Sequence, residues 1–199
     1  MACKSRLIGL TGPSGSGKSE VSAILRSKGY PVLDCDLLAR EAAAKGTAGL
    51  NALVRAFGPS FLASGGELDR KKLGAYVFAD PERVRKLNAV THHYILALLE
   101  ERLAGLSECP LVFLDAPTLF QSGLNRRSDR IILVTASRAL RKERIMRRDG
   151  LTEEAAESRM GAQLSDETLR SLCDYVVEND GPLASLNGKL EEVLLDVKA

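Results

Sequence analysis

Short apolar runs rich in Val, Ile and Leu recur along the chain, and turn-forming residues follow each of them. They occupy 6–11, 31–34, 111–115, 131–134 and 175–178. Unbroken runs of this length are typical of strands that are buried on both faces of a sheet. Segments with helical periodicity lie between them, at 18–28, 81–104, 137–148, 152–164 and 183–196. This alternation predicts an α/β fold with a doubly wound, parallel, five-stranded sheet flanked by helices.

The interval 37–108 breaks the alternation. It contains no convincing strand, only helical pattern interrupted by the turn-forming stretches KGTAG, FGPS and ASGGELD. We therefore expect a single domain over 1–199 that carries a helical insertion at 37–108.

Composition narrows the class of protein. The 199 residues include 28 Lys and Arg against 26 Asp and Glu, a net charge of +2, which disfavours a non-specific nucleic-acid or membrane-surface binder. The four cysteines, Cys3, Cys35, Cys109 and Cys173, form no metal-binding spacing, and the two histidines are adjacent. No apolar run approaches the roughly 20 residues that span a bilayer. We expect a cytoplasmic protein with reduced thiols.

The stretch Gly12-Pro-Ser-Gly-Ser-Gly-Lys-Ser19 satisfies the pattern G-x-x-x-x-G-K-[ST]. It follows a predicted strand and opens a predicted helix, as a phosphate-binding P-loop requires. Glycines let the backbone curl so that its N–H groups face phosphate oxygens at the positive end of the helix dipole. The residues expected to bind nucleotide here are Gly12, Ser14, Gly15, Ser16, Gly17, Lys18, Ser19 and Glu20. The alternative is a glycine-rich turn with a surface lysine.

Within this motif, Lys18 is expected to reach the β- and γ-phosphates of ATP and to act in catalysis. The Ser19 hydroxyl is expected to bind Mg²⁺, the one cofactor expected, which offsets charge as the phosphoryl group leaves.

Two carboxylates end the second apolar run, in the stretch VLDCD. Asp34 and Asp36 occupy alternate positions, so both are able to face the crevice at the carboxyl ends of the strands. There a carboxylate can take the proton of a substrate hydroxyl or hold a metal-bound water. The alternative is that an aspartate at this place caps the next helix.

Three arginines follow a helical spacing in the stretch SRALRKERIMRRDG. Arg141, Arg144 and Arg148 lie along one face, and the guanidinium fork suits phosphate. With the polar helix that follows, the segment 137–165 is expected to form a lid over ATP, on a nucleotide-binding core of 1–36, 109–136 and 166–199. The alternative is a solvated basic face balanced by nearby glutamates.

Seven stretches in this order resemble the dephospho-CoA kinase family, which uses ATP to phosphorylate the ribose 3′-hydroxyl of dephospho-CoA in the last step of CoA biosynthesis. They are IGLTGPSGSGKS, VLDCDLLAR, FG followed by LDRKKLGAYVFADPE, LNAVTHHYI, LDAPTLFQSGL, RIMRRDGLTEEAAESRMGAQ and CDYVVENDG. The resemblance covers nearly the whole chain and implies a P-loop kinase fold, with ATP and dephospho-CoA as ligands.

The resemblance also implies roles for individual residues. Asp36 matches the catalytic base, and Asp34 its neighbour near metal and substrate. Arg40 and His92 match acceptor contacts, which assigns the insertion to acceptor binding. Nucleotide contacts in the second half of the chain are implied for Arg144, which is also expected to be catalytic, and for Arg148, Asn179 and Gly181.

The chain departs from the family pattern at a few positions. Pro13 replaces a glycine and removes one backbone donor, and Cys35 replaces a small residue. Gln121 stands where the family often has Glu, and His93 where a proline often follows the family histidine.

Two other functions remain open on the residues alone. A different small-molecule kinase, acting on a nucleoside, nucleoside monophosphate or shikimate, would share the P-loop and lid arginines. A GTPase-like switch would share the P-loop, but no N-K-x-D guanine-reading motif is present in the later half. The oligomeric state is undetermined, with a monomer favoured.

Overall fold

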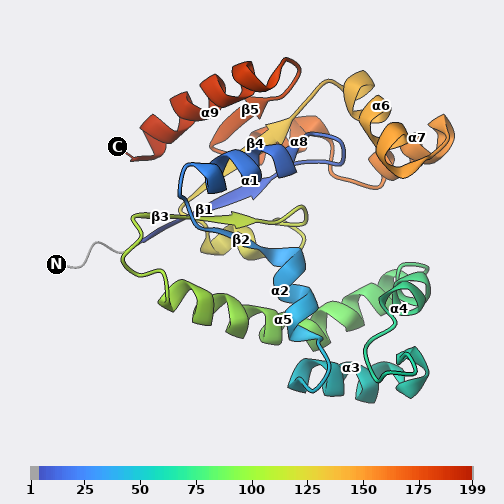
Figure 1. Ribbon diagram of the computed structural model, residues 1–199. Coiled ribbons are helices and arrows are strands. Elements are labelled where there is room, and N and C mark those ends of the chain that lie inside the picture. Colours follow the sequence, from blue (N-terminus) through green and yellow to red (C-terminus); the bar gives the residue numbers. More distant parts are fainter. Residues whose placement is uncertain (1–4, 199) are drawn as a thin grey trace. The chain divides into compact units, whose positions relative to one another are not determined.

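The computed structural model describes residues 5–198, so Cys3 lies outside the described residues. The chain forms two compact units. The first contains the residues up to Val32 together with those from Leu106 onward, and the second is Leu33–Gly105. Figure 1 shows the elements of both units.

The sheet has five strands in the order β2-β3-β1-β4-β5. The strands are β1 (Arg6–Thr11), β2 (Val32–Asp34), β3 (Leu111–Asp115), β4 (Arg130–Thr135) and β5 (Tyr175–Glu178). β1 pairs in parallel with β3 and β4, and β4 pairs in parallel with β5. The predicted parallel five-stranded sheet flanked by helices is confirmed, and the observed strands match the apolar runs to within one residue.

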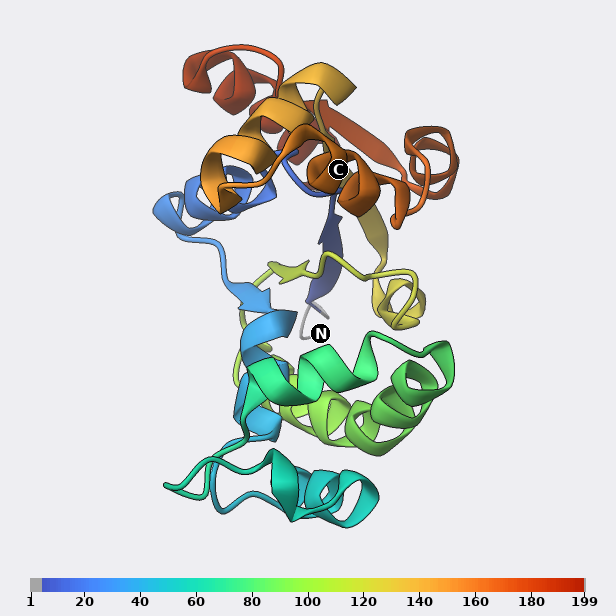
Figure 2. The same ribbon diagram turned by 90° about the vertical axis from the view of Figure 1, so that its right-hand side faces the viewer.

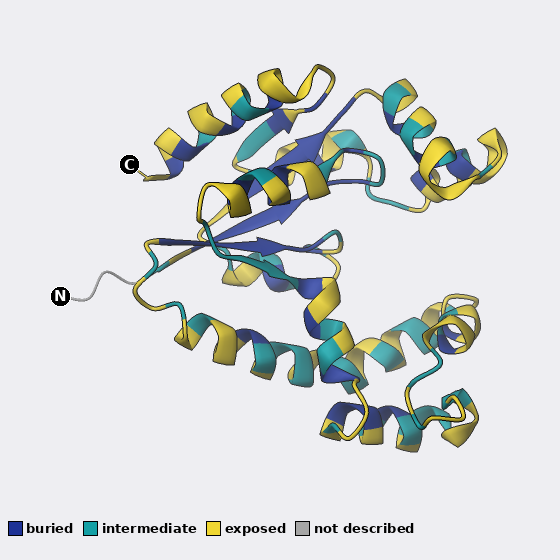
Figure 3. Ribbon diagram, in the orientation of Figure 1, coloured by how far each residue is buried: buried dark blue, intermediate teal, exposed yellow. Residues whose placement is uncertain are grey.

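Helices of the first unit follow the periodic segments. They are α1 (Lys18–Ser27), α6 (Arg138–Asp149), α7 (Glu153–Gly161), α8 (Asp166–Leu172) and α9 (Leu183–Lys198), with the 3₁₀ turn η2 (Leu124–Arg127). α1 and α9 lie on the same face of the sheet (Figure 1). Their apolar residues form one cluster with side chains of β1, β3, β4 and β5. The three central strands, β1, β3 and β4, are buried along most of their length, whereas the outer strands β2 and β5 are mostly half-buried (Figure 3). The short helix α8 was not among the predicted segments.

Aspartate side chains fix where two central strands begin. Asp129 accepts a hydrogen bond from the Leu7 N–H, with N···O 2.7 Å, and Asp174 accepts one from the Ile131 N–H, also 2.7 Å. The polar residues that precede β4 and β5 thereby help to set the strand register. The glycine-rich segment begins directly after the carboxyl end of β1.

The second unit is helical. It contains α2 (Cys35–Ala42), α3 (Ala48–Phe57), the 3₁₀ turn η1 (Pro59–Phe61), α4 (Arg70–Val77) and α5 (Pro81–Ala104). Thr47, Asp69 and Asp80 cap the amino ends of α3, α4 and α5. Leu53, Leu73 and Val77 form the centre of its apolar cluster. Apart from the end of β2, the described residues of this unit contain one isolated antiparallel bridge, between Leu62 and Leu68.

A substitution at Phe113 tests the apolar cluster formed by the sheet, α1 and α9. Its side chain is fully buried in β3, and the Tyr30 ring meets it edge-on with centroids 5.4 Å apart. We expect Phe113→Ala to lower the free energy of unfolding by about 3–5 kcal/mol, because it removes buried contacts and leaves a cavity. Urea denaturation measures this. The matched control is Leu195→Ala, at a side chain 69% exposed, which should change stability by less than about 0.5 kcal/mol. Equal losses in both variants would contradict this placement of the core.

Candidate functional site

The P-loop, residues 12–19, joins the end of β1 to the start of α1. Gly15 and Gly17 have φ of 78° and 88°, in the left-handed region that favours glycine. A Cβ on Gly15 would also lie 2.5 Å from the Arg141 carbonyl oxygen in α6. Both conformation and close packing therefore require glycine in this loop.

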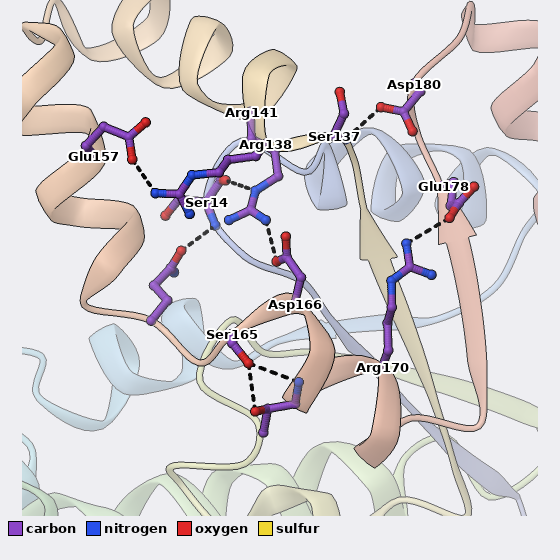
Figure 4. Close-up of polar contacts among 12 residues, drawn as sticks. Ser14, Ser137, Arg138, Arg141, Glu157, Ser165, Asp166, Arg170, Glu178 and Asp180 are labelled. Atoms are coloured by element: carbon purple, nitrogen blue, oxygen red, sulfur yellow. Dashed lines mark hydrogen bonds and ion pairs between the residues drawn. The ribbon is translucent and has the colours of Figure 1, made fainter.

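Two arginines of α6 bind the outward-facing carbonyls of the P-loop. Arg141 Nε donates to the Ser14 carbonyl at 3.2 Å. Arg144 Nη1 donates to the Gly15 carbonyl at 3.3 Å and lies 3.5 Å from that of Ser16. Carbonyl oxygens repel anions, so holding them against cationic groups favours a loop that offers its N–H groups to a phosphate. Arg141 is only 3% exposed and is also paired with Asp166 of α8 (Figure 4).

Asn179 supports the P-loop from the end of β5. Its side chain is buried, and Nδ2 donates to the Ser16 carbonyl at 3.0 Å and to Glu20 Oε2 at 3.1 Å. A Cβ on Gly17 would collide with this amide. Arg144 Nη2 donates to the Asn179 carbonyl at 3.0 Å. The structure thus places Asn179, expected near the nucleotide, in contact with the loop itself.

The hydroxyl of Ser16 points away from solvent. It is 1% exposed, and within residues 5–198 it has no hydrogen-bond partner. Ser16 therefore serves this loop through its main-chain groups. Gly12 packs closely too, because a Cβ there would lie 2.8 Å from the Ser16 Oγ. In contrast, Ser19 and Glu20 are exposed in the first turn of α1.

Lys18 pairs with a carboxylate that the sequence reasoning did not single out. Asp115, the last residue of β3, is buried, forms an ion pair with Lys18 Nζ, and accepts a hydrogen bond from Ser22 Oγ at 2.6 Å. Lys18 and Ser22 are four residues apart on α1 and so share a face. The signal was present in the stretch LVFLD, an apolar run that ends in aspartate just as VLD does.

The amino end of α6 is fixed by Asp180, which follows β5. Its Oδ1 accepts from the Ser137 N–H at 2.7 Å (Figure 4). That main-chain bond lowers the pKa of the Asp180 carboxyl, and the positive charges of Lys189 and Arg144 add to the effect. α6 is therefore held against the P-loop at its start as well as along its length.

Arg148 differs from the two arginines before it on α6. Its side chain is 62% exposed and donates twice to the adjacent Asp149, at 2.9 and 2.8 Å. These bonds lower the pKa of the Asp149 carboxyl, which also pairs with Arg159 of α7. The three arginines predicted to share a face thus divide, since Arg141 and Arg144 hold the loop while Arg148 pairs within the lid segment. Gly181 is exposed.

The predicted acceptor residues lie in the second unit. Asp34 Oδ1 accepts from the N–H groups of Asp36 and Leu37, at 2.9 and 3.1 Å, so the capping alternative is confirmed for Asp34. Asp36 is exposed in the first turn of α2. His92 is exposed on α5.

A second arginine accompanies Arg40 in this unit. Arg70, the first residue of α4, donates to the Arg40 carbonyl at 2.8 Å. Burial lowers the pKa of the Arg70 guanidinium, and the positive charge of Arg40 lowers it further. Sequence reasoning passed over Arg70, although it stands in the quoted stretch LDRKKLG. The residues that the sequence predicts to bind phosphate thus lie in the first unit, and Asp34, Asp36, Arg40 and His92 lie in the second.

Comparison with known proteins decides the family. The family model described as dephospho-CoA kinase matches residues 6–185. The chain belongs to the dephospho-CoA kinase family. It is 45% identical over 196 residues to the dephospho-CoA kinase of Anaeromyxobacter dehalogenans, covering 97% of this chain and 92% of that protein.

Solved structures agree with this membership. A crystal structure of a Thermus thermophilus protein, 43% identical, superposes with a TM-score of 0.86 and covers 98% of both chains. Dephospho-CoA kinase from Campylobacter jejuni, 26% identical, gives 0.71 over 96% of both chains. In this member of the dephospho-CoA kinase family, no described helix has both the length and the apolar character needed to cross a membrane.

Alanine substitutions at two glycines distinguish the effect of steric crowding from that of backbone strain in this dephospho-CoA kinase family member. Gly17 and Gly29 have nearly equal φ, 88° and 83°, but only Gly17 faces a neighbour, since nothing lies within 4 Å of a Cβ on Gly29. We expect Gly29→Ala to cost about 1 kcal/mol of stability with ATP affinity unchanged. Gly17→Ala should weaken ATP binding at least about tenfold, because the methyl group displaces Asn179 from the loop.

Isothermal titration with ATP and thermal unfolding of both variants measure these effects. Equal ATP affinity in the two variants would show that the contact between Gly17 and Asn179 does not shape the phosphate site.

Proposed function

We propose that this protein is an ATP-dependent dephospho-CoA kinase, which phosphorylates the ribose 3′-hydroxyl of dephospho-CoA and releases CoA and ADP in the last step of CoA biosynthesis. The observation that carries the proposal is a P-loop with its carbonyls bound by arginine and asparagine, in a chain that matches the family over residues 6–185.

The P-loop contributes to the reaction by positioning the phosphates of ATP and stabilising their negative charge. The loop amides and Lys18 bind the phosphates of ATP, and the transferred phosphoryl group passes in line to the acceptor oxygen. An ammonium group has three donors, so Lys18 is able to keep Asp115 while donating to phosphate oxygens. Asp115 then sets the direction of the lysine, and Ser22 sets the direction of Asp115.

The residues at the loop suit magnesium. Mg²⁺ prefers oxygen ligands and keeps several waters, and the exposed Ser19 hydroxyl and the Asp115 carboxylate are oxygen donors in the first unit. We propose Ser19 as the direct ligand, with Asp115 as a carboxylate of the same unit near the ion. When bound, the ion offsets negative charge on the β- and γ-phosphates.

The second unit supplies the acceptor site in this proposal. Asp36 takes the proton of the 3′-hydroxyl, because it is an exposed carboxylate in the first turn of α2. Arg40 is the proposed contact for a phosphate of the acceptor, and Arg70, which donates to the Arg40 carbonyl, adds a second positive charge. His92, exposed on α5, is a further acceptor contact.

The segment 137–165 is the proposed lid. Arg144 has three main-chain acceptors around the P-loop, so we assign it first to the shape of the loop and through it to the transferring phosphoryl group. Arg148, exposed beside Asp149, is the lid arginine available to turn toward bound ATP. We also propose a monomer that acts in the cytoplasm, with no nucleic-acid or membrane partner.

An acceptor screen tests the function. ADP release is measured with ATP and Mg²⁺ in the presence of dephospho-CoA, AMP, shikimate or water alone, and the product is identified by mass spectrometry. We expect turnover with dephospho-CoA only. Lys18→Ala controls for contaminating ATPases and should nearly abolish turnover. If AMP or shikimate were phosphorylated in preference to dephospho-CoA, the proposed acceptor would be wrong.

Asp36→Asn tests the base. We expect kcat to fall by roughly 10²-fold or more with little change in KM for ATP, because the amide cannot accept the hydroxyl proton. Asp80→Asn is the matched control, since it makes the same chemical change at the cap of α5, where asparagine caps equally well. Steady-state kinetics compares the two. If Asp36→Asn keeps the wild-type kcat, the base is another group.

A further inference from the structure

Ser14 of the P-loop is held at both of its main-chain groups, which belong to two successive peptides, by side chains of the segment 137–165. The Ser14 N–H donates to Gln163 Oε1 at 3.0 Å, and the Ser14 carbonyl accepts from Arg141 Nε at 3.2 Å. Figure 4 shows Arg141 between Ser14 and Asp166. Ser14 directly precedes Gly15, the first residue of the loop in the left-handed conformation. Its peptide orientation therefore sets how the chain enters the curled part of the loop.

Gln163 is placed by helix packing. It follows the carboxyl end of α7 by two residues, and its N–H lies 3.3 Å from the Met160 carbonyl. Met160 and Ala156 are buried against Ile145 of α6. α6 and α7 lie side by side in both ribbon views (Figures 1 and 2). The position of Gln163 thus depends on the apolar contact between these two helices.

The contacts form a closed circuit. It runs from the Ser14 carbonyl through Arg141 into α6, through the apolar contact into α7, and back through Gln163 to the Ser14 N–H. Asp166 of α8 joins the circuit at Arg141, whose buried guanidinium depends on that carboxylate for charge compensation. A displacement of α7 relative to α6 would therefore act on the Ser14 peptide.

We propose that Gln163 is a positioning residue for phosphoryl transfer. Its side-chain carbonyl fixes the peptide that joins Pro13 to Ser14, while Arg141 fixes the next one. Together they set the direction of the P-loop amides, so that the lid segment and the phosphate-binding loop respond as one element. Gln163 acts through Ser14 and touches neither substrate. The proposal rests on the kinase function above, because the effect it predicts is on turnover.

The hydrogen bonds at Ser14 indicate that Gln163 supports the P-loop and does not compete with the nucleotide for the loop amides. The bonds to Gln163 and Arg141 satisfy the Ser14 N–H and carbonyl together, as the two ends of one residue in a fixed turn require. The donors left to a phosphate are then the N–H groups that follow Ser14 in the loop, at the amino end of α1. Losing Gln163 would release one end of Ser14 while Arg141 still held the other.

Two substitutions of Gln163 distinguish the role of its side chain as a hydrogen-bond acceptor from the effect of charge at this position. Gln163→Met keeps the length of the side chain but removes the acceptor, and we expect kcat to fall about tenfold. Gln163→Glu keeps an acceptor for the Ser14 N–H but adds negative charge near the phosphates. We expect it to keep kcat within about twofold of wild type while KM for ATP rises severalfold. Ser158→Ala, at an exposed position on the preceding helix α7, should leave both constants unchanged.

A second measurement does not depend on turnover. Hydrogen exchange of the Ser14 amide, followed by NMR, should be slow in the wild type and in Gln163→Glu and faster in Gln163→Met, with thermal unfolding checking that all variants fold. If the wild-type enzyme did not use dephospho-CoA, the proposed kinase function would be wrong. Hydrogen exchange of the Ser14 amide, together with ATP titration of the variants, would still test whether Gln163 positions the loop.

Two results would overturn the proposal. Faster Ser14 exchange in Gln163→Met with wild-type kcat would make the bond purely structural. A lower KM for ATP in that variant would show that Gln163 competes with the nucleotide. Should Gln163→Met fail to fold, loss of kcat in folded Gln163→Glu would overturn the proposal equally.

Discussion

Hydrogen bonds between the guanidinium groups of α6 and the carbonyls of the P-loop are the constraint on which the site depends. A loop that is to bind a polyphosphate has to turn its N–H groups inward, and each carbonyl then needs a donor elsewhere. Arg141, Arg144 and Asn179 supply those donors for Ser14, Gly15 and Ser16. The positive charges that would be expected to bind phosphate directly therefore also give the loop its shape.

The arrangement links distant parts of the chain. α6 is fixed at its start by Asp180, and along its length it meets the P-loop on one side and α7 on another. Asn179 and Asp180 are adjacent at the end of β5, so one short segment supports both the loop and α6. The end of β5, the P-loop and the segment 137–165 are consequently connected by a few hydrogen bonds.

The two units divide the chemistry. The first contains the P-loop and the ion pair between Lys18 and Asp115. The second contains the carboxylate of Asp36 and the guanidinium groups of Arg40 and Arg70, which carry a permanent positive charge. In the proposed function, residues 33–105 select the acceptor and the remaining residues bind ATP.

Local signals in the sequence were enough to determine the sheet, the P-loop and the helix that follows it. Apolar runs give strands because both faces are buried, and the spacing of glycines, Lys18 and Ser19 is a local pattern that needs no tertiary partner. Family motifs extended this to the activity. The cap at Asp34 was foreseen only as an alternative, since a carboxylate before a helix suits capping and catalysis equally.

Tertiary structure alone decided which groups meet. Arg141, Arg144 and Arg148 share one helical spacing, yet burial and partners separate them, because only the packing of α6 brings the first two against the P-loop. Asp115, Asn179 and Gln163 are far from the loop in sequence and reach it through β3, β5 and the end of α7. Periodicity reports which face of an element is buried, but the identity of the neighbour on that face depends on how the elements fold together.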